Sequence, residues 1–314
     1  MNKVDHCPIG MRGIVPSLNT PFDGCGMVDG EALGALVEET ISAGCQGMLA
    51  VAVAGEQASL SFAEKDRIAR IITERVEGRI PVIISVTADC VVESRRLSAM
   101  AKSAGATGVC CQVPRNLSGR PLTDFFRSIA DNGPDLLMIQ DLDWGGGGLD
   151  VSEITRLFDE LACFRCLKIE TVPAGPKYSA VLKQTDGRLH VSGGWAVNQL
   201  IDALDRGVHA FMPTGMDRIY VAIYSAYRSG RRDAARALFD SLLPVLAFSN
   251  QHVDISIRFF KMLRYAEGLF SSDFCRPPIK QLDDQQQMEA ARLVRSVARI
   301  QSDLALPASA GKSS

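Results

Sequence analysis

The sequence alternates between short apolar runs and segments with helical periodicity, and this alternation constrains the fold more than any other feature. Runs rich in apolar or β-branched residues predict eight strands, at 13–21, 47–56, 81–88, 108–114, 136–143, 166–171, 189–195 and 210–216. Apolar residues recur at helical spacing between these runs, for example in 31–43, 63–76, 92–104 and 151–161. Nearly continuous apolar strands that alternate with helices predict a parallel sheet with helices on its outer face.

The number of repeats predicts a closed α/β fold. Eight strand–helix units within roughly 220 residues are typical of a (β/α)8 TIM barrel. An open doubly wound sheet is the alternative, but no GxGxxG fingerprint follows the first strand. Residues 1–216 are therefore expected to hold the barrel strands and the helices between them.

The strand pattern stops after residue 216. Residues 217–302 are predicted to form three or four helices, of which 284–300 is clearly amphipathic. We therefore assign 217–303 to the last barrel helix and a C-terminal helical extension. The polar tail 304–314 is expected to be disordered, because its residues are small and end the chain.

The bulk composition excludes several classes of protein. A net charge of −2 gives no basic surface for nucleic acid. The longest clean apolar run, 242–248, is far too short to span a membrane. The first residues lack the apolar segment of a signal peptide, and nine scattered cysteines predict reduced thiols in a cytoplasmic protein. Cys163 and Cys166 have CxxC spacing without a second pair, so packing is expected there and no metal site is predicted.

One lysine lies where a barrel enzyme does its chemistry, at the C-terminal ends of the strands. Of nine lysines only Lys168 is in the interior of a predicted barrel strand, and most others are in helices or polar loops where a solvated charge is expected. Lys168 could extend its ammonium group to the rim of the barrel. Alternatively it is a desolvated amine with a lowered pKa, which can attack a carbonyl carbon and form a Schiff base.

Glu170 shares a strand face with Lys168, because strand side chains alternate and residues two apart are about 6–7 Å distant. Two opposite charges at this distance attract by roughly 2 kcal/mol at an effective dielectric constant near 20. This attraction raises the pKa of the lysine and opposes nucleophilic attack. The pair is therefore either a simple ion pair or a nucleophile with an acid–base partner that moves a proton beside the imine.

Several short motifs occur in the order found in a known family. They are NTPF at 19–22, AGEQASLS at 54–61, RIPVIISV at 79–86, AGATGV at 104–109, CLKIE at 166–170, SGG at 192–194 and RPPIK at 276–280. In this order the chain resembles the dihydrodipicolinate synthase/N-acetylneuraminate lyase family of class I Schiff-base lyases. The resemblance implies a TIM barrel, a 2-oxo acid substrate bound as an imine at Lys168 without a separate cofactor, and a homo-oligomer, either a tetramer or a dimer.

The resemblance also indicates how the substrate is held. Family members usually carry Gly-Thr-Thr-Gly-Glu after the second strand and bind the substrate carboxylate there. This chain has AVAGE at 52–56 and lacks both hydroxyl groups, so the backbone N–H groups of Val53, Ala54 and Gly55 are expected to bind the substrate carboxylate instead. Gly193, Phe211 and Thr214, near the ends of the last two strands, complete the expected substrate site.

The tyrosine that relays protons in the family aligns with Gln140, and no tyrosine precedes Tyr178. The 2-keto-3-deoxy-L-arabonate dehydratase branch of the family is similar at these points. It also lacks the hydroxyl pair and the tyrosine, and it carries Gln-Asp and Lys-Ile-Glu-Thr motifs like those at 140–141 and 168–171. The resemblance therefore favours dehydration.

The chemistry of an imine agrees with this interpretation. An imine at C2 makes the C3 protons acidic, so Glu170 can act as the base at C3 while Gln140 holds a hydroxyl group. Retro-aldol cleavage instead needs a base at the C4 hydroxyl. Three alternatives stay open: dihydrodipicolinate synthase, a pyruvate-dependent or phosphosugar aldolase, and a catalytically silent paralogue. The glycine run 145–148 is either a phosphate-binding loop or a lid or spacer.

Overall fold

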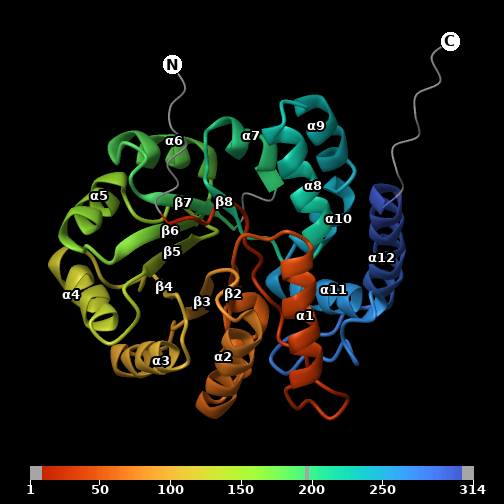
Figure 1. Cartoon of the computed structure of the whole chain (residues 1–314), viewed down its shortest axis with the longest axis horizontal. Helices are drawn as coiled ribbons and strands as arrows, with labels where there is room; N and C mark the ends of the chain where they lie inside the picture. Colours follow the sequence, from red (N-terminus) through yellow and green to blue (C-terminus); the bar gives the residue numbers. More distant parts are fainter. Residues whose placement is uncertain (1–8, 195–197, 306–314) are drawn as a thin grey trace.

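A computed structural model describes residues 9–194 and 198–305 of the chain, and its centre is a ring of parallel strands (Figure 1). The strands are β1 Gly13–Ile14, β2 Met48–Ala50, β3 Val82–Ser85, β4 Gly108–Gln112, β5 Leu137–Asp143, β6 Phe164–Thr171, β7 His190–Gly193 and β8 Ala210–Phe211. Each lies within a run predicted as a strand, apart from the first two residues of β6. The end of the seventh predicted strand, Trp195, lies outside the described residues.

The sheet closes on itself. The strands pair in parallel in the order β1-β8-β7-β6-β5-β4-β3-β2. The segment after β1 then meets β2, where the Leu49 N–H donates to Pro16 O at 2.9 Å and the Leu18 N–H donates to Leu49 O at 2.8 Å. These bonds join the two ends of the sheet, and the predicted (β/α)8 barrel is confirmed.

Helices follow the strands and cover the outside of the ring (Figure 1). They are α1 Gly30–Ser42, α2 Phe62–Val76, α3 Val91–Ser103, α4 Gly119–Ala130, α5 Val151–Glu160, α6 Ala174–Gln184, α7 Leu200–Asp205 and α8 Asp217–Arg228. Their starts follow local chemistry: Ser61 caps α2 in a capping box with Glu64, and Asp29 accepts from the Ala32 N–H at the start of α1. Two short 3-10 turns, η1 Val53–Gly55 and η2 Gln57–Ser59, come directly after β2.

The C-terminal part has more helices than predicted. Beyond α8 lie α9 Arg232–Asp240, α10 Leu243–Ser249, α11 Val253–Ala266 and α12 Asp284–Ala305, so residues 217–305 hold five helices rather than three or four. Pro244 in the first turn of α10 separates it from α9, because proline suits a helix start and not a helix interior. α12 also extends two residues into the predicted tail, whose remaining residues 306–314 lie outside the described chain.

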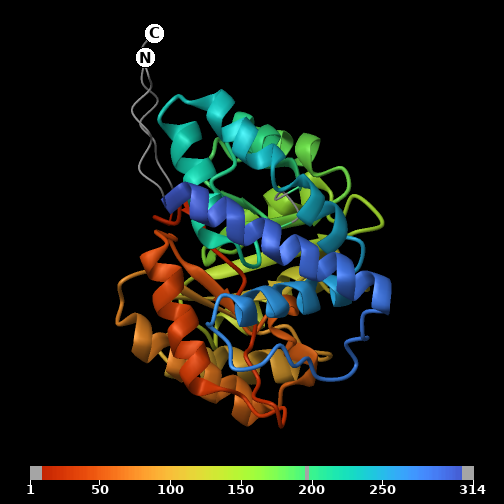
Figure 2. The same ribbon diagram turned by 90° about the vertical axis from the view of Figure 1, so that its right-hand side faces the viewer.

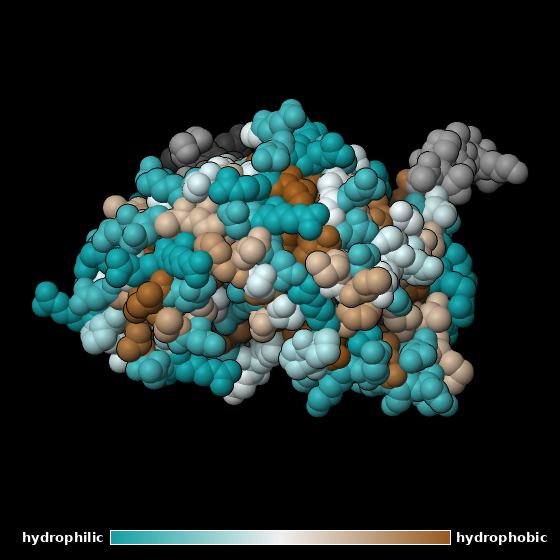
Figure 3. Space-filling view, turned by 90° about the horizontal axis from the view of Figure 1, so that it is seen from below, coloured by the Kyte–Doolittle hydropathy of each residue, from teal (hydrophilic) through white to brown (hydrophobic). Residues whose placement is uncertain are grey.

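Figure 2 shows α12 running diagonally along one side of the barrel. It contacts α8, α10 and α11, so the C-terminal helices pack together against the barrel. None of the described helices combines the length and apolar character needed to cross a membrane. On the face seen in Figure 3 hydrophilic side chains predominate, and hydrophobic ones appear as small separate patches.

Two groups of buried residues form the core. The smaller one fills the inside of the barrel with Met11, Val15, Leu49, Ala52, Ile83, Cys110, Met138, Cys166, Ala210 and Met212. The larger one lies between the strands and the helices. Successive residues of a strand alternate between these two layers. Cys166 therefore packs inside the barrel, as predicted for the CxxC pair, and the eight described cysteines are free thiols.

Candidate active site

Lys168 and Glu170 point into the barrel from β6. Their neighbours Leu167 and Ile169 pack in the outer layer, which fixes the two polar side chains on the inner face. Lys168 is 4% exposed and Glu170 is 7% exposed, and Lys168 Nζ lies 3.2 Å from Glu170 Oε2. The lysine therefore does not extend to solvent at the rim. Its amine is held inside the barrel beside a carboxylate.

Gln140 completes a buried trio with this pair. It lies opposite Lys168 in the pairing of β5 with β6, and its Nε2 donates to Glu170 Oε2. No described residue donates to the other oxygen, Oε1, which lies against Gly194. A Cβ at position 194 would be 2.0 Å from Oε1 and 2.7 Å from Lys168 Cε, so only glycine fits here. Two donors thus hold Oε2 in place, whereas Oε1 remains available to accept a proton.

The trio lines a cavity at the C-terminal side of the strands. Val53, Ala54 and Thr214, which were predicted to bind substrate, also line this cavity. The barrel contributes further lining side chains, namely Ser17, Leu142, Trp144, Met212 and Pro213. The structure therefore brings together six of the nine predicted site residues.

The other three predicted residues do not line the cavity, and strand geometry explains two of them. Phe211 packs in the layer between strands and helices, because it is Met212 that points inward from this strand end. Gly193 pairs with Ile169 and Phe211 inside the sheet, and the next residue, Gly194, faces the cavity instead. Gly55 is the last residue of η1 and is buried, and its N–H donates to Ala52 O at 3.0 Å.

The turn η1 presents two backbone N–H groups to the cavity. Those of Val53 and Ala54 have no hydrogen-bond partner among the described residues, and both residues line the cavity. The turn is fixed from behind, because Asn19 Nδ2 donates to Ala54 O at 2.8 Å and Thr20 Oγ1 donates to Gly55 O at 2.7 Å. Two free N–H groups in a rigid turn can bind a carboxylate.

A buried ionic network supports this turn from the outside. Lys261 of α11 is fully buried, where its Nζ pairs with Glu56, donates to Phe274 O at 2.8 Å and lies 4.1 Å from the centre of the Phe22 ring. Burial lowers the pKa of Lys261. The expectation of a solvated charge is wrong here, because the folding of α11 against η1 brings the lysine to Glu56.

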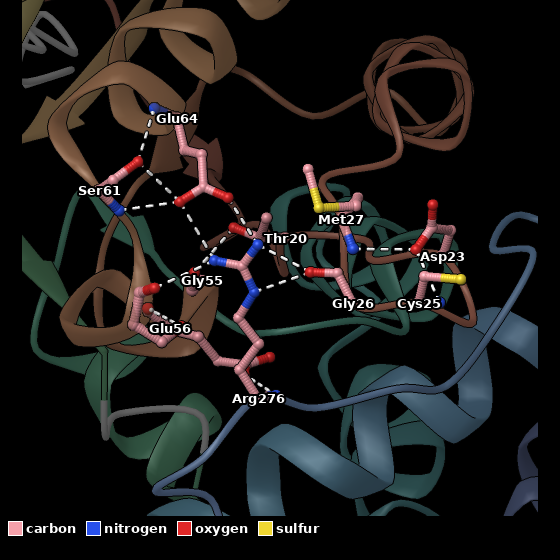
Figure 4. A network of polar contacts seen from close by, with 11 residues as sticks. Thr20, Asp23, Cys25, Gly26, Met27, Gly55, Glu56, Ser61, Glu64 and Arg276 are labelled. Atoms are coloured by element: carbon pink, nitrogen blue, oxygen red, sulfur yellow. Dashed lines mark hydrogen bonds and ion pairs between the residues drawn. The ribbon is translucent and has the colours of Figure 1, made fainter.

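Arg276 joins the same network (Figure 4). Its backbone N–H donates to Glu56 Oε2 at 2.8 Å, and its guanidinium bonds Glu64, Ser59 O and Gly26 O. The guanidinium holds the pKa of Glu64 down to about 2. Two motifs far apart in the sequence, at 54–61 and 276–280, therefore meet in one structural network.

A third buried lysine fixes the glycine-rich loop. Lys177 of α6 contacts Asp141 and Gly147 O, although a solvated charge was expected for it. The N–H groups of Gly145 and Gly148 donate to the Asp143 carboxylate at 3.2 and 3.1 Å. These amides already bind an anion of the chain itself, which argues against a phosphate-binding loop. The loop is a spacer that these contacts hold in place, and it positions Trp144 at the cavity.

Sequence reasoning missed the contribution of the C-terminal helices. Side chains of α8, α10 and α11, among them Tyr220, Ile257 and Phe260, also line the cavity. Helical periodicity identifies buried positions in these helices but does not distinguish a core contact from a cavity wall. Within the part of the chain that the structure describes, no group of three His, Cys, Asp or Glu side chains could hold a metal ion.

Comparisons with known proteins agree with this architecture. Residues 10–297 match the Dihydrodipicolinate synthetase family. L-2-keto-3-deoxyarabonate dehydratase of Azospirillum brasilense is 27% identical over 90% of this chain and 94% of its own. 4-Hydroxy-tetrahydrodipicolinate synthase of Syntrophus aciditrophicus is 27% identical over 75% of this chain and 81% of its own. The crystal structure of dihydrodipicolinate synthase from Rhodopseudomonas palustris superimposes with a TM-score of 0.85 at 25% identity, covering 92% of this chain and 99% of that one.

Proposed function

This chain belongs to the dihydrodipicolinate synthetase family, and on that premise we propose that it dehydrates a 2-keto-3-deoxy sugar acid through a Schiff base at Lys168. Members of this family are lyases, which supports an enzyme. The observation that carries the finer proposal is the buried trio of Lys168, Glu170 and Gln140 in the lining of the cavity. It provides an amine, a carboxylate and an amide where elimination needs them.

The first step joins substrate and enzyme. The substrate carboxylate binds the N–H groups of Val53 and Ala54, which places the 2-oxo carbon near Lys168. The neutral amine attacks C2, and loss of water leaves a protonated imine. The positive charge of this imine makes the C3 protons acidic, and it also attracts the Glu170 carboxylate beside it.

The second step removes water. Glu170 takes a proton from C3, and the electron pair forms an enamine. The C4 hydroxyl then leaves with the proton that Glu170 returns to it, so one water molecule is released and a C3–C4 double bond forms. A proton then moves from C5 to C3 and the C5 hydroxyl proton moves to C4, which removes the double bond and turns C5 into an aldehyde. Water finally hydrolyses the imine, which frees Lys168 and, from the five-carbon acid, 2-oxoglutarate semialdehyde. Gln140 stays neutral throughout and orients Glu170 through its amide N–H.

The same residues suit the alternative reactions less well. A proton relay at the position of Gln140 would need an ionisable group, and an amide does not exchange protons near neutral pH. Among the described residues, Lys168 and Glu170 are the charged side chains that line the cavity, so this lining offers no second cation for a phosphate or a second carboxylate. Both points favour dehydration of an uncharged sugar chain over condensation with aspartate semialdehyde or cleavage of a phosphosugar.

A direct assay tests the proposal. Purified protein receives 2-keto-3-deoxy-arabonate, and formation of 2-oxoglutarate semialdehyde is followed beside a pyruvate–aspartate semialdehyde reaction. We expect turnover of the sugar acid that is lost in Lys168→Ala, with little condensation. Efficient condensation without dehydration would contradict the proposal, and an absence of both reactions would favour the silent paralogue.

The expected assembly into a dimer or tetramer and the expected cytoplasmic location stay predictions. Light scattering during size-exclusion chromatography measures the mass in solution. A mass of one chain would contradict the expected homo-oligomer.

A further inference from the structure

The C-terminal helices form one wall of the catalytic cavity rather than an appendage outside it. This wall consists of Tyr220 from α8, Leu246 from α10, Asn250 directly after α10, and Val253, Ser256, Ile257 and Phe260 from α11. The same cavity is also lined by Val53 and Ala54 of η1, which carry the free N–H groups, and by Lys168 of the barrel strands. A substrate whose carboxylate binds η1 and whose C2 bonds Lys168 therefore has a third region available for its remote end.

The wall is mostly apolar and carries no charged side chain. Leucine, valine, isoleucine and phenylalanine side chains make up most of it, and none of its members is ionised at neutral pH. Burial of a charge against such a wall without a partner is unfavourable, whereas an uncharged carbon chain can pack on it. The chemistry of the wall thus points to a remote end without phosphate, carboxylate or amine.

Tyr220 is one of three wall residues with a hydrogen-bonding side chain, beside Ser256 and Asn250, of which Asn250 already donates to Asn198. The residue is 1% exposed and lines the cavity, and its hydroxyl makes no hydrogen bond to a described residue. A tyrosine hydroxyl at such a position is available to a ligand. Burial, together with the nearby Asp217 carboxylate, raises the pKa of Tyr220, so the hydroxyl keeps its proton and can donate it in a hydrogen bond. This donor faces the cavity of Lys168 from the side of the helices.

We propose that α8, α10 and α11 form a subsite for the end of the substrate remote from its carboxylate, and that this subsite selects a short, uncharged, hydroxyl-bearing carbon chain through Tyr220. The proposal rests on the proposed function, because it takes the Lys168 imine as the fixed point from which the remote end is placed. It adds a determinant of specificity that lies outside the barrel.

The test compares a full substrate with a fragment that lacks the remote end. Dehydration of 2-keto-3-deoxy-arabonate gives kcat/KM, and borohydride trapping of pyruvate gives the rate of imine formation alone. For Tyr220→Phe we expect kcat/KM to fall about three- to tenfold, the usual effect of one neutral hydrogen bond, while pyruvate trapping is unchanged. Tyr227→Phe is the matched control on the same helix, because its hydroxyl bonds Asp205 outside the cavity.

Charge and size at the remote end are tested with longer acids. We expect wild-type protein to use 2-keto-3-deoxygluconate at least about tenfold better than its 6-phosphate, because the wall has no cation for the phosphate. Ile257→Ala enlarges the subsite and should shift the preference from the five-carbon toward the six-carbon acid. This second variant keeps the test informative if Tyr220→Phe does not fold.

The outcomes separate this proposal from the proposed function. If Tyr220→Phe leaves kcat/KM unchanged, or lowers pyruvate trapping as much as dehydration, the subsite proposal is wrong. Equal use of the phosphorylated and unphosphorylated acids would also overturn it. If wild-type protein traps no pyruvate at Lys168, the Schiff-base function itself fails, whatever the variants show.

Discussion

Of the three buried lysine–carboxylate pairs among the described residues, two serve clearly different purposes: Lys168 with Glu170 and Lys261 with Glu56. Lys168 and Glu170 face a cavity, and Lys168 has a single carboxylate contact. Lys261 pairs with Glu56, but it also donates to a carbonyl oxygen and packs on the Phe22 ring, and it is absent from the cavity lining. Both amines are almost fully removed from solvent.

The comparison shows that burial alone does not identify a catalytic lysine. An amine surrounded on all sides by partners stabilises the fold, because removing any partner leaves a buried group unsatisfied. An amine with one partner and an open side toward a cavity can react with a ligand. The difference between the two pairs therefore lies in what else surrounds the nitrogen, and each of the following predictions tests that difference.

The largest effect is expected on stability, at the structural pair. Lys261→Met leaves the Glu56 carboxylate buried without its cation, which typically costs about 3–5 kcal/mol. Chemical denaturation measures this loss, and Lys261→Met/Glu56→Gln should recover part of it. The folded variant should still trap pyruvate at Lys168. Loss of trapping in a fully folded variant would show that the two pairs are not separate in function.

The next effect is expected on catalysis, at the reactive pair. Glu170→Gln should lower kcat about 10²-fold or more, because it removes a positioned acid–base group, while imine formation with pyruvate continues. Stability should change less than in Lys261→Met, since the amide still fits beside Gln140. Normal turnover of Glu170→Gln would mean that Glu170 is only an ion-pair partner of Lys168.

A pH experiment distinguishes the structural network from the active site. The folded pKa of Glu64 is about 2, below its unfolded value, because Arg276 binds the carboxylate. Its contribution to stability is therefore complete above the unfolded pKa and is lost as the pH falls toward 2. Wild type should exceed Glu64→Gln in stability by about 1–3 kcal/mol at pH 7, and this difference should shrink below about pH 4.5. A difference independent of pH would contradict the assignment.

The smallest effect is expected at Gln140. Gln140→Ala should raise KM about two- to tenfold with a smaller change in kcat, because the amide holds a hydroxyl and orients Glu170 but transfers no proton. Steady-state kinetics with the sugar acid separates the two parameters. A fall in kcat as large as that of Glu170→Gln would place Gln140 in the proton transfer itself.

The sequence predicted the barrel and the inner face of its sixth strand because both depend on local patterns. Alternation along the strand is enough to place Lys168 beside Glu170, and the order of the strands places Gln140 next to them. It failed at Phe211 and Gly193, where a shift of one residue exchanges the inner and outer faces. β7 and β8 are short, so the alternation of residues along them does not show which residue faces the inside of the barrel.

The residues that sequence reasoning missed depend on contacts between distant segments. Lys261 and Lys177 look like surface charges in isolated helices, and only the packing of those helices against Glu56 and Asp141 buries them. In α8 alone, Tyr220 looks like an ordinary buried residue of the apolar helix face. Only the packing of α10 and α11 beside it makes it part of a cavity wall. No spacing or composition within one helix carries this information.

Borohydride trapping tests the central claim most directly. The protein is incubated with pyruvate and borohydride, and the modified peptide is identified by mass spectrometry in wild type, Lys168→Ala and Lys261→Met. We predict one adduct, on Lys168, that disappears in Lys168→Ala and persists in folded Lys261→Met. An adduct that persists in Lys168→Ala, or that forms on Lys261 in the wild type, would contradict the distinction between a reactive and a structural buried lysine.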